Sequence, residues 1–214
     1  MHSLITGANR GIGAALASEL TSRGCEVIGT ARSSEGYEPL DVTDPASVAD
    51  LAARLDGVAL DALVCNAGVY LDKGQPLEGG YPAAMWAESF AANVTGVFLT
   101  VQALLPHLRR GATPRIMIIS SQMASHTRAP GGSYIYRASK AAALNLGRNL
   151  ATDLKPKGIA VGIYHPGWVQ TDMGGTTAEI TPEDAASGLA DRLQALSLET
   201  TGCFETWDGR AHPY

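Results

Sequence analysis

Short apolar runs alternate with amphipathic stretches along nearly the whole chain. Short apolar runs are typical of buried strands, and apolar positions three or four residues apart are typical of helices. The runs predict strands at residues 3–6, 26–30, 61–65, 115–120, 159–164 and 202–206, and a short one at 37–40. The amphipathic stretches predict helices at residues 11–23, 45–55, 81–108, 136–154 and 182–196, the third with a candidate break near Ser89.

Strands that alternate with helices indicate an α/β fold in which helices cover both faces of a parallel sheet. We expect one Rossmann-like, doubly wound domain over residues 1–214, with a mostly parallel sheet of six or seven strands. Only about eight residues, 31–38, separate the second and third strands, whereas a parallel crossover usually contains a helix. This crossover helix should therefore be missing or reduced.

Composition excludes several classes of protein. A net charge of −5 argues against a nucleic-acid partner held by bulk electrostatics. No apolar tract reaches the length of a membrane span, and the first residues do not resemble a secretory signal. The five histidines and three cysteines lack the spacing of metal ligands. We therefore expect a cytoplasmic protein without a metal site, a membrane partner or a nucleic-acid partner.

A glycine loop joins the first predicted strand to the first predicted helix, in the order Gly7-Ala8-Asn9-Arg10-Gly11-Ile12-Gly13. Gly7 permits a tight turn, Gly11 lets the backbone approach a pyrophosphate, and Gly13 lets the helix pack against the strand. The N-terminus of the helix then offers unpaired N–H groups to phosphates. The alternative is a glycine-rich turn without a ligand.

Tyr136 and Lys140 are four residues apart in a stretch that favours a helix, so they should lie on one face. A lysine ammonium beside a phenol favours the phenolate, which predicts a tyrosine able to exchange a proton with an alcohol or carbonyl. The spacing alone is a weak signal. Tyr134 is a competitor, but no lysine follows it by four residues.

The chain resembles the short-chain dehydrogenase/reductase (SDR) family. The resemblance is carried, in the family's order, by the glycine loop, Asn66-Ala67-Gly68, Ser121, Tyr136-x-x-x-Lys140 and Pro166-Gly167. The short length, the stretch from His165 to Met173 and the Asp208-Gly209 ending further resemble the C-factor-like subgroup.

The resemblance implies a nicotinamide cofactor and four catalytic residues. Tyr136 would be the general acid/base, and Lys140 would lower its pKa and hold the nicotinamide ribose. Ser121 would hydrogen-bond the substrate oxygen, with Ser120 as the alternative. Asn93 would hold a water that connects Lys140 to solvent, the alternative being an ordinary helix or capping residue. Two donors can stabilise the negative charge that builds on oxygen during hydride transfer.

The cofactor preference is read at the end of the second strand. Ala31 stands where an NAD-binding site usually has an acidic residue, and Arg32 and Arg10 could grip a 2′-phosphate. We therefore expect NADP(H) rather than NAD(H), unless Arg32 is simply a solvated loop residue. The predicted cofactor residues are Gly7, Asn9, Arg10, Gly11, Ile12, Gly13, Arg32, Asp41, Val42, Asn66, Ala67, Gly68, Tyr136, Lys140, Pro166, Gly167, Val169 and Thr171.

The predicted substrate pocket is mostly apolar or aromatic, which suits a small or medium neutral carbonyl or alcohol. It comprises Ser121, Met123, Gly132, Tyr134, Trp168 and Met173, of which Trp168 and Met173 could equally be packing residues. The stretch from Ser121 to Tyr136 is longer than the commonest spacing in the family, so the loop at residues 129–133 should bulge.

Two functions fit these predictions. One is an NADP(H)-dependent oxidoreductase, and the other is a dinucleotide-binding signalling or regulatory protein with little turnover, as some C-factor-like relatives suggest. The resemblance also implies a homodimer or homotetramer formed through the helices at about 81–108 and 134–154.

Overall fold

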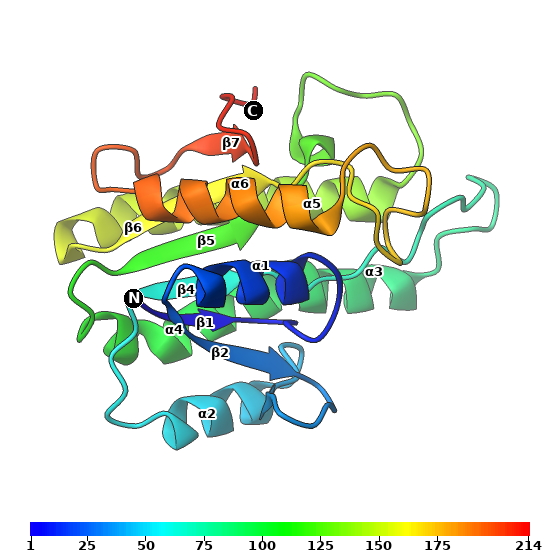
Figure 1. Ribbon diagram of the computed structural model, residues 1–214. Helices are drawn as coiled ribbons and strands as arrows, with labels where there is room; N and C mark the ends of the chain where they lie inside the picture. The colour runs from blue at the N-terminus through cyan, green and yellow to red at the C-terminus, as the bar shows by residue number, and fades with distance from the viewer.

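The computed structural model describes all residues, 1–214, and contains a seven-stranded parallel sheet (Figure 1). The strand order is β3-β2-β1-β4-β5-β6-β7. The strands are β1 (His2–Ile5), β2 (Glu26–Ala31), β3 (Glu38–Pro39), β4 (Ala62–Cys65), β5 (Arg115–Ile119), β6 (Ala160–His165) and β7 (Phe204–Thr206). The Rossmann-like doubly wound fold is confirmed.

Helices cover both faces of this sheet, and Figure 1 shows α1 and α6 side by side on the face nearer the viewer. The helices are α1 (Gly11–Ser22), α2 (Pro45–Arg54), α3 (Ala83–Phe90), α4 (Gly96–Leu108), α5 (Tyr134–Leu154) and α6 (Pro182–Ala195). Three short helical turns complete the chain: η1 (Ala91–Thr95), η2 (Gln122–Ala124) and η3 (Lys155–Lys157).

The core lies in two layers because successive strand side chains point to opposite faces. Leu4 packs in the layer under α2, α4 and α5, whereas its neighbour Ile5 packs in the layer under α1 and α6. Every residue of β4 and β6 is buried, as expected of central strands covered on both faces.

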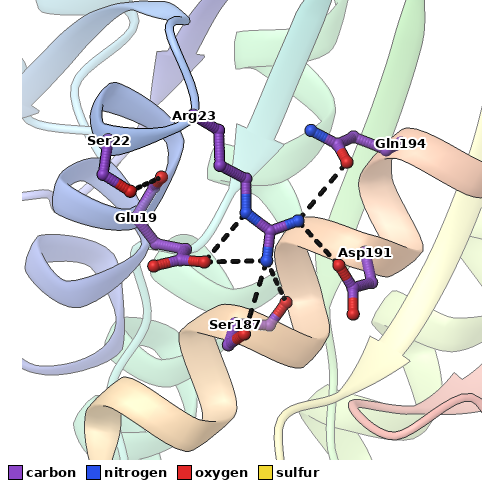
Figure 2. A network of polar contacts seen from close by, with 6 residues as sticks. All are labelled: Glu19, Ser22, Arg23, Ser187, Asp191 and Gln194. Carbon is purple, nitrogen blue, oxygen red and sulfur yellow. Dashed lines mark hydrogen bonds and ion pairs between the residues drawn. The ribbon is translucent and has the colours of Figure 1, made fainter.

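Arg23 joins the C-terminus of α1 to α6 (Figure 2). Its Nη1 lies 2.6 Å from Oδ1 of Asp191, and its Nη2 lies 2.7 Å from Oε1 of Glu19. Nη2 also donates to the carbonyl oxygen of Ser187 at 3.2 Å. A guanidinium presents several donors in one plane, so a single side chain fixes the relative position of the two helices.

The crossover from β2 to β3 contains no helix, as predicted, and β3 has only two residues. The long helical run differs from prediction. It begins at Ala83, and it has no break at Ser89 but passes through the π-helical turn η1 before α4. π-Helical turns are often found at functional sites, and this one contains Asn93.

The run Ala83–Leu108 is also the one helix long and apolar enough to cross a membrane by length and composition. Its apolar side is used inside the protein, because Val97, Val101, Leu104 and Leu108 pack in the core under β4 and β5. The apolar character of this run is therefore explained by its place on the sheet.

The order of the strands fixes where a ligand can bind. The chain proceeds from β1 outward to β2 and β3, then returns to the other side of β1 with β4. In open α/β sheets ligands bind beyond the carboxyl ends of the strands at this switch point. The loops after β1, β4 and β5 meet there.

Candidate active site

Hydrogen bonds tie the loop after β4 to the end of β1. The Thr6 Oγ1 accepts from the backbone N–H groups of Asn66 and Ala67, both at 3.0 Å. In return the side-chain amide of Asn66 donates to the carbonyl oxygens of Thr6 at 2.9 Å and Gly7 at 3.0 Å. The start of the glycine loop and the Asn66-Ala67-Gly68 segment, both predicted to bind the cofactor, therefore lie side by side.

The glycine loop has the geometry of a phosphate cradle. Gly7 and Gly11 have φ values of 66° and 53°, a region that strongly favours glycine. A Cβ on Gly13 would lie 2.3 Å from the carbonyl oxygen of Gly7, so only glycine fits there. No side chain caps the N-terminus of α1, which leaves its N–H groups to an anionic ligand. These features fit the pyrophosphate of a dinucleotide.

The end of β2 and the loop that follows it contact the glycine loop. The Ala8 N–H donates to the carbonyl oxygen of Thr30 at 2.9 Å, and the Asn9 side chain donates to the Ser34 hydroxyl at 3.0 Å. Ala31 is buried and Arg32 is exposed. The segment that should discriminate between NAD and NADP is therefore next to the phosphate cradle.

Arg10 departs from expectation. Its Nη1 lies 3.2 Å from Oδ2 of Asp172, so it faces the segment after β6 rather than joining Arg32. Both side chains of this pair are exposed, and exposed ion pairs contribute little to stability.

Asp41 accepts two hydrogen bonds from Thr43. The Thr43 hydroxyl donates to its Oδ1 at 2.7 Å and the Thr43 N–H at 2.9 Å, and these bonds lower the pKa of Asp41. The carboxyl group is therefore ionised at neutral pH.

Tyr136 and Lys140 lie on one buried face of α5, as predicted. Each has less than a tenth of its surface exposed, and the Lys140 Nζ is 5.7 Å from the centroid of the Tyr136 ring. Nζ donates to the carbonyl oxygen of Ile119 at 3.0 Å, at the end of β5. Gly68 lies beside this ammonium, since a Cβ there would be 3.6 Å from Nζ.

Burial reverses the expected direction of the tyrosine pKa. Burial raises the pKa of Tyr136, a hydrogen bond with Ser121 lowers it in part, and Tyr70 and Asp72 raise it further. Burial also lowers the pKa of Lys140 to about 8. Lys140 is not among the groups that shift the pKa of Tyr136, so its expected lowering of that pKa stays a prediction. Residue spacing in the sequence predicts which side chains lie together, but it does not predict how completely the packed structure excludes water from them.

Ser121, and not Ser120, is the serine beside Tyr136. The Ser120 hydroxyl is buried and donates to the carbonyl oxygen of Lys140 at 3.1 Å. The Ser121 hydroxyl accepts from the Met123 N–H at 3.1 Å and is near enough to the Tyr136 hydroxyl to lower its pKa. Ser120 therefore fixes α5 to β5, and Ser121 faces the site.

Asn93 is within the site, and its side chain makes three hydrogen bonds. Its amide exchanges two hydrogen bonds with the backbone of Val69, at 2.8 and 2.9 Å, and donates to the Ser139 hydroxyl at 2.9 Å. Asn93 therefore positions the loop after β4 against α5. Its expected role in holding a water stays a prediction.

Several of the predicted pocket residues lie at the surface. Tyr134, Trp168 and Met173 are each more than 40% exposed, which leaves them accessible to a substrate. Residues 129–132 are exposed, and Gly131, Gly132 and Ser133 all have positive φ, so this loop bulges as predicted.

The segment after β6 closes one side of the site. Gly167 has a φ of 90°, and Val169 is buried. Thr171 reaches the glycine loop, because a Cβ on Gly11 would lie 3.4 Å from its methyl group.

Three site residues were missed by sequence reasoning, and all follow Gly68. The Tyr70 ring stacks on that of Tyr136 with centroids 4.1 Å apart. Asp72 accepts hydrogen bonds from the first turn of α5, and Lys73 donates to the carbonyl oxygen of Met173 at 3.1 Å. No motif marked them, because they lie in an irregular segment and their partners are distant in sequence.

We predict that Lys140→Met changes how stability depends on pH. Below pH 8 Lys140 is charged in both states, so the folded wild-type protein carries the full cost of a buried ammonium. Between pH 8 and the ordinary lysine value of 10.5 the unfolded state binds more protons, so raising the pH stabilises wild type. Relative to the variant, wild type should gain roughly 3 kcal/mol across this window in urea titrations.

The exposed Lys155 provides the control, because Lys155→Met should give no such gain. A wild-type minus Lys140→Met difference that stays constant with pH would contradict the buried, perturbed state of Lys140.

Comparison with known proteins agrees with this geometry. A family model described as short chain dehydrogenase matches residues 2–181. The chain is 37% identical to 1-hydroxy-2-glutathionyl-2-methyl-3-butene dehydrogenase of Rhodococcus sp. (strain AD45), with 96% of each chain covered. It is 38% identical to the C-signal of Myxococcus xanthus over 72% of this chain and 93% of that protein.

Among solved structures, NADPH-bound carbonyl reductase from chicken fatty liver superposes with a TM-score of 0.91 and 30% identity. The superposition covers 100% of this chain and 98% of that one. Together with the glycine loop, Ser121, Tyr136 and Lys140 around one edge of the sheet, these matches show that the chain belongs to the short-chain dehydrogenase/reductase family of oxidoreductases.

Proposed function

We propose that this protein is an NADP(H)-dependent oxidoreductase that interconverts a small or medium carbonyl compound and its alcohol. The observation that carries this proposal is the arrangement at the carboxyl edge of the sheet. At that edge the Tyr136 phenol lies near Ser121 and Lys140. The glycine loop, whose geometry fits a pyrophosphate, lies at the same edge of the sheet.

In carbonyl reduction Ser121 and Tyr136 donate hydrogen bonds to the substrate oxygen. Negative charge builds on that oxygen, and donors already in place stabilise it without reorganisation. A bound nicotinamide dinucleotide supplies the hydride, or accepts it in the reverse direction. Tyr136 then gives its proton to the oxygen, and the Lys140 ammonium stabilises the tyrosinate that remains. Alcohol oxidation runs these proton steps backwards.

The raised pKa of Tyr136 suits the first of these roles. A phenol that holds its proton at neutral pH is ready to act as an acid. For alcohol oxidation the tyrosinate must form, and a positive charge in the site favours it. We therefore propose that charge brought in by the ligand, together with Lys140, sets the working pKa.

Tyr136→Phe should abolish turnover while leaving dinucleotide binding intact, since only the hydroxyl is removed. General acid–base catalysis contributes about 10²–10⁴-fold, so kcat should fall by at least about a hundredfold. The assay is NADPH consumption with a panel of ketones and aldehydes, followed at the nicotinamide absorbance. Tyr214→Phe is the matched control, because this exposed tyrosine lies outside the proposed site and should retain full activity.

The similarity to C-signal supports a second candidate, a dinucleotide-binding signalling or regulatory protein with little turnover. The presence of Asn93, Ser121, Tyr136 and Lys140 in one site favours the enzyme. If Tyr136→Phe keeps all biological activity while still binding NADPH, the second candidate replaces the first.

NADPH should be preferred over NADH because Arg32 is exposed next to the glycine loop and makes no ion pair within 4.0 Å. Arg10 can exchange its weak ion pair with Asp172 for a phosphate. Arg32→Ala should raise the Kd of NADPH about tenfold, as expected for one charge-assisted contact, and leave that of NADH unchanged.

Fluorescence titration with both dinucleotides measures this preference. Arg109→Ala, an exposed arginine at the end of α4, is the control and should change neither affinity. Equal affinity of the wild-type protein for NADPH and NADH would overturn the assignment.

We propose a cytoplasmic homodimer or homotetramer formed through α4 and α5. In support, Phe98 on α4 is 40% exposed, and α5 presents the small, half-buried side chains of Ala138, Ala141 and Ala142. Phe98→Glu would place a charge in this contact and should shift the protein to monomer in sedimentation velocity.

Ser18→Glu on the exposed face of α1 should leave the assembly unchanged. A monomeric wild-type protein at micromolar concentration would contradict the proposal.

A further inference from the structure

The N-terminus of α5 lacks a local cap. Its N-cap residue, Ser133, has φ 48° and ψ 42° and makes no side-chain hydrogen bond to the helix. The first N–H groups of a helix have no partner within the helix, and leaving them unpaired when buried is costly. Ile135 and Tyr136 are both buried, so their N–H groups need partners from elsewhere.

Asp72 supplies those partners from a loop that lies 63 residues earlier in the chain. Its Oδ2 accepts from the Ile135 N–H at 2.8 Å, and its Oδ1 accepts from the Tyr136 N–H at 3.2 Å. The residue has 0% exposure and no ion pair. The positive end of the helix dipole and these N–H groups are therefore what stabilise its charge.

A second contact reinforces the same connection. The Tyr70 hydroxyl lies 2.5 Å from the Ser133 Oγ, and the Tyr70 ring stacks on that of Tyr136. The segment after β4 thus holds the backbone and one ring face of Tyr136.

We infer that Asp72 is a positioning residue for Tyr136: its buried carboxylate fixes the first turn of α5 and thereby the position of the phenol. This inference rests on the proposed role of Tyr136 as acid and base. The backbone bonds fix where the Tyr136 side chain starts, and a displacement of about 1 Å in a reacting group can cost a hundredfold in rate. The negative charge of Asp72 disfavours the tyrosinate and so opposes Lys140.

The groups that face Tyr136 are few, which makes the electrostatic part testable. Tyr70 and Asp72 come from the loop after β4, Ser121 from the loop after β5, and Lys140 from α5 itself. Of these, Asp72 is the one carboxylate. Removing its charge should make the tyrosinate easier to form.

Asp72→Asn keeps the size of the side chain and removes the charge. We expect kcat for carbonyl reduction to fall about tenfold or more, with the Kd of NADPH unchanged. Reduction needs protonated Tyr136, so its activity should also begin to fall at a lower pH than in wild type. Alcohol oxidation needs the tyrosinate, and its activity should rise at a lower pH.

Asp61→Asn is the matched control. The Asp61 carboxylate also accepts two backbone N–H groups from distant segments, those of His2 at 2.9 Å and Ala112 at 3.0 Å, but it lies before β4, at the other end of the sheet. It should lower the melting temperature without moving the pH profile. If Asp72→Asn also lowers only the melting temperature, the inference is overturned and Asp72 is a structural cap.

Two further variants separate the possible failures. In a Tyr136→Phe background Asp72→Asn should have no additional effect on the residual rate, and an additive loss would contradict action through Tyr136. A fully active Tyr136→Phe protein would instead overturn the proposed function. If Asp72→Asn does not fold, Asp72→Glu keeps the charge: a lower kcat with an unshifted pH profile supports the inference, and a wild-type kcat overturns it.

Discussion

The burial of the Lys140 ammonium is the constraint on which the site depends. A charged amine that is removed from water needs fixed partners, and here the backbone carbonyl of Ile119 accepts its hydrogen bond. That bond joins α5 to the end of β5, and the bond from Ser120 to the Lys140 carbonyl joins them again. The face of α5 that carries Tyr136 is therefore held against the carboxyl edge of the sheet.

In the other contacts at that edge, too, a polar side chain bonds to backbone atoms. Asn66 joins the ends of β1 and β4, Asn93 joins the loop after β4 to α5, and Asp72 caps α5. Each of these side chains bonds to main-chain atoms of a different segment. The site is thus assembled from pieces far apart in sequence, and its precision comes from groups that do not themselves react.

The fold could be predicted from sequence because strands and helices have characteristic patterns of apolar and polar positions and are separated by typical turn residues. Buried strands read as apolar runs, and α2 and α6 begin after Asp44 and Thr181, residue types that favour helix starts because their side chains accept from backbone N–H groups. The π-helical turn was missed because it changes the hydrogen-bond register without changing the apolar pattern.

At the site, Tyr136, Lys140 and Ser121 carried family signals. Asp72 did not, because a lone aspartate in a loop does not reveal which helix it caps. The direction of the tyrosine pKa was also beyond reach, since it depends on how much water the packed structure excludes.

The pH dependence of both directions of one reaction tests the central claim most directly. With a ketone and its own alcohol, kcat/KM for reduction and for oxidation should be measured over the same pH range with the wild-type protein. If Tyr136 is the acid and the base, reduction falls and oxidation rises with increasing pH, and one ionisation governs both limbs. Profiles governed by two unrelated ionisations, or a reaction that keeps its rate at every pH, would contradict the account.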